Sequence, residues 1–268
     1  MSDLLFTVED GIAEITLNRP DSMNAFSENM ILEWISALET IRDSEEIRVV
    51  VVSGKGRGFC AGGDIKEMIK GNGFYRSDRD MTSTALARKN SLWKMVQRVP
   101  LLLEEIDQPV IAKVHGFAFG AGLDMALMCD IRIAAEDTKL SESYVNVGLV
   151  PGDGAAYFLP RLVGTDQALD MLWTGKVIKA KEAKEMGLVT HVVSESEIDQ
   201  FTKDYVEKLA NGPQQAMRLT KRAVYQSRNT SLRTSLDMIS SSMGLVTELE
   251  DYQTGVQAVI DKQKPNFK

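Results

Sequence analysis

Short apolar segments alternate with helical patterns along the first two thirds of the chain. Four segments have the length and the β-branched content of strands, and they read GIAEITLNRP, IRVVVVSG, QPVIAKVHG and DIRIAAED. Between the first two, residues 27–43 carry apolar side chains at helical spacing, namely Met30, Ile31, Trp34, Leu38 and Ile41. The alternation predicts an α/β fold over residues 1–195, with these five side chains in its core.

The pattern changes near residue 196. Strand-like segments stop there, and four helical segments follow with breaks near NGPQ, RNTS and TELED. We therefore expect residues 196–268 to form a helical C-terminal region attached to the core of residues 1–195. Residues 71–105 are the least patterned part of the core, and we interpret them as a candidate lid over a site.

Composition narrows the classes of function. The chain has 268 residues and a formal net charge of −7, which argues against a nucleic-acid partner because phosphate contacts need a surplus of Lys and Arg. The N-terminus lacks the basic and apolar regions of a signal peptide, and no run reaches the roughly 18 apolar residues of a membrane span, so we expect a cytoplasmic protein without a membrane partner. Cys60, Cys129 and two histidines form no metal-ligand pattern.

Two glycine-rich turns carry the candidate chemistry. Each follows an apolar strand, in VVVVSGKGRGFCAGGDIKEM and in VIAKVHGFAFGAGLDMALMCD, and such turns commonly direct backbone N–H groups at an anion. Gly56, Gly58 and Ala61 also fit the dinucleotide pattern G-x-G-x-x-G/A. The helix after them is short, however, and no acidic residue ends a following strand, so a dinucleotide-dependent oxidoreductase is the weaker interpretation.

The turns FCAGGDIKEM and GFAFGAGLDMALMCDIRIAAED resemble the two signature segments of the enoyl-CoA hydratase/isomerase, or crotonase, family. The resemblance extends in the family's order through ITLNRPDSMNAF, GLVPGDGAAYFLPRLVG, TGKVIKAKEAKEMGLVTHVV and DYQTGVQAVIDKQKPNF, and so covers nearly the whole chain. It implies a crotonase-like spiral of β-β-α turns with a helical C-terminal trimerisation region. It also implies an acyl-CoA thioester substrate, no further cofactor, and a homotrimer or a dimer of trimers.

The resemblance assigns roles to the two turns. Chemistry beside a thioester passes through an enolate, and two backbone amides can stabilise the charge on its oxygen, by about 3–4 kcal/mol for one donor in comparable sites. By similarity to the family, the donors are the amides of Gly63 and Ala121. The residues expected to bind coenzyme A are Met23, Asn24, Ala25, Gly63, Asp64, Ile65 and Lys66.

Two positions correspond to the acids of the family's hydratases. The first is Asp124, three residues after Ala121, and this spacing places its carboxylate on the same helix face as that amide. The alternative is a solvated first-turn acid that interacts with the helix dipole. The second position holds Tyr144, whose phenol, with a normal pKa near 10, is a poor base but a capable hydrogen-bonding group.

Other polar residues near this segment have competing explanations. Asp153 is the candidate second acid, although PGDGAAYFLPRL also places it where a helix N-cap belongs. Glu142 is a reserve that would share a strand face with Tyr144. His115, in KVHG, is better explained as a hydrogen-bonded turn residue than as a base, and Asp130 as a structural residue.

The combined hypothesis is an enoyl-CoA hydratase/isomerase-like lyase or isomerase. It would stabilise an enolate at Gly63 and Ala121 and move protons with Asp124, aided by Asp153 and Tyr144. One working carboxylate suits double-bond isomerisation, whereas hydration needs a second group to activate water. The alternatives are a CoA-thioester hydrolase or decarboxylase on the same scaffold, and a catalytically silent CoA-binding subunit.

Overall fold

The computed structural model describes residues 2–69 and 84–267 and contains two sheets. The larger sheet has the strand order β1-β2-β3-β4-β6-β9; only its β1–β2 pair is antiparallel. Its strands are Leu4–Glu9, Ile12–Leu17, Val49–Gly54, Val110–Val114, Ile131–Ala135 and His191–Val193. The smaller sheet contains β5 (Phe117–Phe119), β7 (Lys139–Ser141) and β8 (Ile178–Lys179). The four predicted strands are confirmed as β2, β3, β4 and β6.

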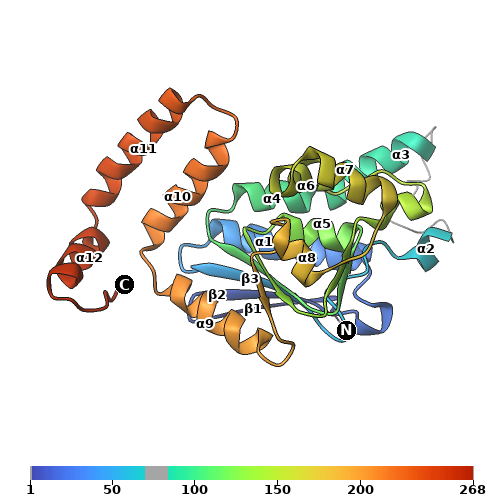
Figure 1. Ribbon diagram of the computed structural model, residues 1–268, viewed down its shortest axis with the longest axis horizontal. Helices are drawn as coiled ribbons and strands as arrows, with labels where there is room; N and C mark the ends of the chain where they lie inside the picture. The colour runs from blue at the N-terminus through green and yellow to red at the C-terminus, as the bar shows by residue number, and fades with distance from the viewer. Residues whose placement is uncertain (1, 70–83, 268) are drawn as a thin grey trace.

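Successive turns of the chain give one strand to each sheet and then a helix. Strand β4 leads into β5 and helix α5 (Ala121–Leu127), and β6 leads into β7 and, after a 3-10 turn, helix α6 (Ala155–Val163). Because β5 and β7 pair in parallel, these turns stack on one another. The predicted spiral of β-β-α turns is confirmed, and the stacking places α5 next to α6 (Figure 1).

One face of the larger sheet is covered by helix α1 (Glu28–Asp43). Ser27 caps this helix by accepting a hydrogen bond from the amide of Met30 at 3.0 Å. The five apolar side chains predicted to be core are all completely buried. On the same side lie the helices of the segment interpreted as a lid. They are α3 (Thr84–Ser91), a π-helical turn (Leu92–Val96) and α4 (Arg98–Glu105), while residues 70–83 lie outside the described residues.

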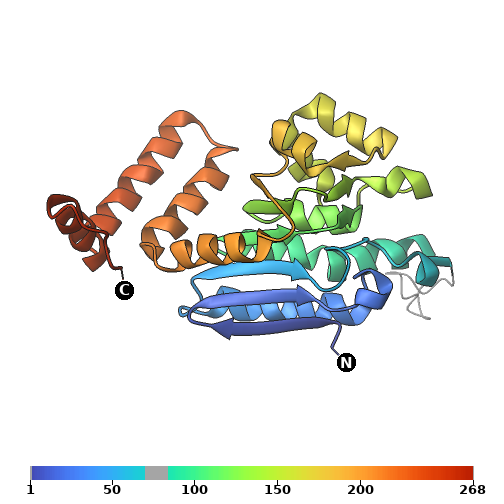
Figure 2. The same ribbon diagram turned by 60° about the horizontal axis from the view of Figure 1, so that its bottom comes forward.

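The other face of the sheet is covered by α9 (Ile198–Ala210), which lies across the strands in Figure 2. Apolar side chains of α9 pack against those of the central strands in a second buried cluster, namely Val49, Val51, Ile111, Ile133, Ala135, Ile198, Val206 and Ala210. Strand β3 is therefore buried on both faces, which accounts for its uninterrupted valines.

Three further helices follow, of which the first is hydrogen-bonded to this body and the other two extend away from it (Figures 1 and 2). They are α10 (Gln214–Ser227), α11 (Leu232–Thr247) and α12 (Glu250–Ile260), and the breaks before them fall where the sequence predicts. Residues 196–267 thus form four helices, of which the first belongs to the packing of the sheet. Within the described part of the chain, no helix combines the length and apolarity needed to cross a membrane.

Candidate active site

The two glycine-rich turns lie directly against each other. Cys60 pairs with Ala118 in a parallel bridge, and the amide of Phe119 donates to the carbonyl of Cys60 at 3.0 Å. A Cβ on Gly122 would lie 2.4 Å from that carbonyl oxygen, and one on Gly62, where φ is +88°, would lie 2.6 Å from the carbonyl oxygen of Phe119. Only glycine permits this approach.

The approach leaves two backbone donors side by side. The amide nitrogen of Ala121 lies 3.1 Å from where a Cβ of Gly62 would stand, so it is next to the residue that precedes Gly63. Neither the Gly63 nor the Ala121 amide has a hydrogen-bond acceptor within residues 2–69 and 84–267. Ala121 keeps a negative φ, so its methyl group does not disturb the turn. Two adjacent free N–H groups can stabilise charge that develops on an oxygen.

The segments expected to bind coenzyme A are also neighbours. The amide of Ala61 donates to the carbonyl of Met23 at 3.0 Å, and the amide of Phe26 donates to that of Gly62 at 2.8 Å. Met23 is 45% exposed and available to a ligand. Asn24 is completely buried, and its side-chain amide donates to three backbone carbonyls, those of Lys55, Gly58 and Phe59. Its contacts are therefore structural.

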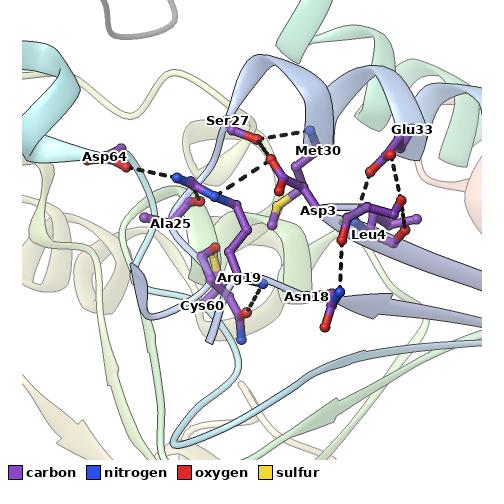
Figure 3. Close-up of polar contacts among 12 residues, drawn as sticks. Asp3, Leu4, Asn18, Arg19, Ala25, Ser27, Met30, Glu33, Cys60 and Asp64 are labelled. Atoms are coloured by element: carbon purple, nitrogen blue, oxygen red, sulfur yellow. Dashed lines mark hydrogen bonds and ion pairs between the residues drawn. The ribbon is translucent and has the colours of Figure 1, made fainter. Parts of the chain in front are cut away.

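Arg19 joins these two segments, a role that is not evident from the sequence. Its guanidinium donates to the carbonyl of Ala25 and lies 3.4 Å from Asp64 Oδ2 (Figure 3). Asp64 Oδ1 in turn accepts the amide of Lys66 at 3.1 Å, at the start of helix α2 (Ile65–Ile69). Arg19 lies inside the segment ITLNRPDSMNAF quoted above, but the sequence alone does not distinguish it from an ordinary surface arginine.

A shallow hollow of about 540 Å³ adjoins Met23. Three cationic side chains, Arg57, Lys139 and Lys179, line it together with one acid, Asp137. The sequence does not reveal this group because its members lie on separate strands and turns. A hollow of this charge next to Met23 can accept phosphate groups.

Asp124 is completely buried in α5, so the interpretation as a solvated first-turn acid is wrong. Its Oδ2 atom lies 2.8 Å from the Tyr144 hydroxyl and accepts the amide of Asp153 at 3.3 Å. The amide of Ala155, the first residue of α6, also donates to this carboxylate. Burial and, next, the charge of Asp153 raise the pKa of Asp124 to about 7. At neutral pH this group can both take and return a proton.

Asp153 is buried beside Asp124, with its Oδ2 atom 2.9 Å from the Tyr144 hydroxyl. The N-cap of α6 is Gly154, and no side chain caps that position, so the interpretation of Asp153 as a helix cap is wrong. Burial raises the pKa of Asp153 to about 6, against the opposing effect of the Tyr144 hydrogen bond.

The Tyr144 hydroxyl lies between these two acids. A phenol has a single proton to donate, yet the oxygen of Tyr144 makes two short contacts with carboxyl oxygens. Both contacts are hydrogen bonds only if one carboxyl group is protonated and donates to the phenol oxygen. The raised pKa values of Asp124 and Asp153 fit such a shared proton. The structure thus brings together all three residues that the sequence analysis proposed for proton transfer.

Glu142, expected from the sequence only as a reserve, is the third carboxyl group of the cluster. It does not share a strand face with Tyr144, because residues Ser143–Val147 form a 3-10 turn after β7. Its side chain is completely buried and lies within hydrogen-bonding reach of Asp124. Burial and the neighbouring Asp124 raise its pKa well above the usual value.

A cavity of about 600 Å³ opens beside this cluster. It extends from Asp153 to helices α4 and α10, and apolar side chains including Trp93, Leu101, Met128 and Phe158 line it. Gln97 fixes one wall by donating to the carbonyl of Gly152 at 2.7 Å. On the α10 side, Lys221 and Tyr225 hold Asp130 at 2.8 and 2.7 Å, which confirms Asp130 as a structural residue. The segment interpreted as a lid contributes to this cavity.

The remaining candidates have no catalytic geometry. His115 Nε2 lies 2.9 Å from the carbonyl of Gly56, so His115 is the hydrogen-bonded turn residue that the sequence predicts. Cys60 is completely buried, its thiol donates to the carbonyl of Asn24 at 3.0 Å, and burial raises its pKa to about 12. Across the described residues, no group of three His, Cys, Asp or Glu side chains has a geometry suited to a metal ion.

Comparison with known proteins agrees with this arrangement. Residues 7–268 match the family model described as enoyl-CoA hydratase/isomerase. The chain is 32% identical to the crotonyl-CoA hydratase of Syntrophomonas wolfei, over 99% of this chain and 97% of that one. It is also 32% identical to the 1,2-epoxyphenylacetyl-CoA isomerase of Escherichia coli, over 100% of this chain and 98% of that one.

Solved structures give the same result. The crystal structure of an enoyl-CoA hydratase from Bacillus anthracis is similar with a TM-score of 0.88 at 31% identity, covering 99% of each chain. The chain belongs to the enoyl-CoA hydratase/isomerase family.

Proposed function

We propose that this hydratase/isomerase-type enzyme moves the double bond of an enoyl-CoA thioester by proton transfer through an enolate. The amides of Gly63 and Ala121 stabilise the enolate oxygen, and Asp124 takes a proton from one carbon and returns it to another. The observation that supports this most is the complete burial of the Asp124 carboxyl group one helical turn from a free amide, and this burial raises the pKa of the group to about 7. The relatives named as a crotonyl-CoA hydratase and a 1,2-epoxyphenylacetyl-CoA isomerase support the thioester substrate.

Hydration of the same substrate class is the second candidate. It is favoured by the presence of a second buried carboxyl group, Asp153, near Asp124. A water that two acids activate together must contact both of them, however, and the Tyr144 hydroxyl already contacts the Oδ2 atoms of both acids. This arrangement favours isomerisation, with Tyr144 and Asp153 acting on the protonation of Asp124.

Coenzyme A would enter as part of the substrate, and no separate cofactor is proposed. Its thioester end would lie at Gly63, with Met23, Ala25 and residues 64–66 along the carrier. The hollow lined by Arg57, Lys139 and Lys179 adjoins Met23 and suits the phosphate groups. Asn24 would act indirectly, because its side chain is buried and holds the backbone of this segment.

A panel of thioesters tests the proposed reaction. The enzyme is incubated with 2-enoyl-CoA and 3-enoyl-CoA substrates of several acyl types in deuterated water, and products are followed by mass spectrometry. Isomerisation should interconvert the 2-enoyl and 3-enoyl thioesters without adding a water, with deuterium entering only as far as the proton held by Asp124 exchanges with solvent, whereas hydration should add one water. EDTA should leave the rate unchanged.

Two results would contradict the proposal. Release of free coenzyme A or carbon dioxide would show a hydrolase or decarboxylase, and a thermal shift with coenzyme A without any turnover would show a silent binding subunit.

The expected homotrimer, or dimer of trimers, is also a proposal, as is the cytoplasmic location. The oligomeric state is supported by helices α11 and α12, which have no buried residue yet expose large apolar side chains. These side chains include Leu232, Leu236, Met243, Leu245, Val256, Val259 and Ile260. A surface of this kind is typical of an interface between subunits.

Light scattering should therefore give the mass of three or six chains. Leu236→Glu should dissociate the assembly because it would bury a charge, whereas Asp237→Asn on the same helix should not. A stable monomer in the unmodified protein would overturn the proposal.

A further inference from the structure

The carboxyl group of Glu142 has no place in the proposed reaction, yet it is completely buried. Among the described residues, neither of its oxygen atoms accepts a hydrogen bond from any donor. Asp124 Oδ1 is also buried without a hydrogen-bond partner. Oδ2 of the same carboxyl group, by contrast, contacts the Tyr144 hydroxyl and accepts the amide of Asp153. The unpartnered oxygen atoms therefore belong to two carboxyl groups that lie within hydrogen-bonding reach of each other.

The backbone fixes this contact. Ser141, the last residue of β7, pairs with Phe119 of β5, and its carbonyl accepts the amide of Gly120 at 2.8 Å. Gly120 is the residue immediately before α5, so the chain at Glu142 is held against the first turn of the helix that carries Asp124. The two side chains meet because two regular elements are paired, and a loop movement cannot separate them easily.

The titratable groups that act on Glu142 among the described residues are two carboxyl groups and a phenol. Asp124 approaches from α5, Asp153 from the segment before α6, and Tyr144 from the following 3-10 turn, and no cation within the described residues contributes to its environment. An ionised Glu142 would be a buried, unpaired charge beside a second carboxylate, which is strongly unfavourable. A protonated Glu142 has one O–H group, and Asp124 Oδ1 is the acceptor without a partner.

We propose that Glu142 is a positioning residue that stays protonated and donates its hydrogen to Oδ1 of Asp124, which rests on the proposed role of Asp124 as the base. The donated hydrogen bond holds the carboxylate in one orientation. It also favours the ionised form of Asp124 and so opposes the effect of burial on that group. A neutral donor thus keeps a deeply buried base usable near neutral pH.

Two variants of similar size separate this role from the alternatives. Glu142→Gln keeps a neutral donor toward Asp124, whereas Glu142→Met fills the space without one. The measurement is the pH dependence of kcat/KM, in which activity rises with pH as Asp124 ionises, with a midpoint near 7. The Glu142→Met variant should move this midpoint upward by about one pH unit. At pH values below the midpoint it should also lower kcat about tenfold, with little change in KM. Gln should restore both the midpoint and kcat to within a few-fold of the unmodified enzyme.

The direction of the shift is decisive. If Glu142 were ionised, both variants would remove a repelling charge and move the midpoint downward, and this result would overturn the proposal. A midpoint that stays in place with Met would do the same, since a purely structural side chain changes the yield of folded enzyme and not the pH profile. A Gln variant as impaired as the Met variant would show that donating a hydrogen bond is not the role.

A second measurement does not depend on turnover. A carboxyl that is protonated when folded and ionised when unfolded releases its proton on unfolding at pH 7. In weak buffer with an indicator dye, the unmodified protein should therefore release about one proton more than Glu142→Gln on denaturation. Equal release would overturn the inference about Glu142. If the two proteins differ in the number of protons released but no enoyl-CoA is turned over, the inference that Glu142 is protonated would stand and the proposed function would be wrong.

Discussion

Asp124→Asn is expected to lower kcat by about 10²- to 10⁴-fold on the best enoyl-CoA substrate, because this is the usual contribution of a general acid or base. The change leaves the Gly63 and Ala121 amides and the carrier-binding segments untouched. Affinity for coenzyme A, measured by calorimetry, should therefore stay within a few-fold, and the loss should appear in kcat. The acid-side fall in activity with a midpoint near 7 should also disappear.

Thermal unfolding of Asp124→Asn shows whether a loss of activity in this variant comes from a loss of folded protein. The folded-state pKa of Asp124 is raised, so its favourable contribution to folding is complete below the unfolded value of 3.8 and is lost as pH rises to about 7. At pH 8, Asp124→Asn should consequently unfold at the same or a higher temperature than the unmodified protein. Asp199→Asn, at an exposed acid paired with Lys113, should retain full turnover. Full activity of Asp124→Asn would refute the proposed mechanism even if the CoA site is correct.

Gly122→Ala is expected to reduce kcat by about 10²- to 10³-fold, the effect of losing one oxyanion donor in comparable enzymes. The added methyl would stand 2.4 Å from the carbonyl oxygen of Cys60, and because that atom belongs to the backbone, the two glycine-rich turns must move apart. The Gly63 and Ala121 amides could then no longer contact one oxygen. We also expect unfolding to become easier by about 1–3 kcal/mol, as in other overpacked cores.

The measurement is single-turnover kinetics with a saturating thioester, alongside thermal unfolding. Free coenzyme A has no thioester oxygen, so its binding should change little. Gly244→Ala adds the same methyl in α11, where a Cβ would meet no atom within 4 Å, and should leave kcat unchanged. A normal kcat for Gly122→Ala in folded protein would mean that the two amides do not act on one oxygen.

The sequence predicts the elements of this fold well because their signals are local. The helical spacing in residues 27–43 and the valines of β3 each reflect burial on a particular face, and both patterns are confirmed. The role of α9 is harder to foresee, because an amphipathic helix looks the same whether it packs against its own sheet or another subunit. Its contact with β3 and β6 is known only from the structure.

The site shows the same division between local and distant effects. The glycines and the spacing of Ala121 and Asp124 are local, and they identify the two turns. The helix-cap interpretation of Asp153 fails because the amide of Ala155, at the start of α6, is satisfied by Asp124 from another helix, which leaves the Asp153 side chain to Tyr144. Glu142 lies in the polar segment SES, where composition indicates solvent exposure, and its burial follows from the pairing of β7 with β5 next to the start of α5.

The environment of Cys60 protects the enzyme from alkylation by its own substrate. An α,β-unsaturated thioester is an electrophile that alkylates thiolates, and Cys60 lies three residues from the proposed oxyanion donor Gly63. With a pKa of about 12, only about one thiol in 10⁵ is ionised at pH 7, and the sulfur is fully covered by protein. Cys129 is buried with a similarly raised pKa. The folded enzyme should therefore resist self-inactivation during turnover, and a mutation that loosens the turn at Cys60 would make it sensitive to its substrate.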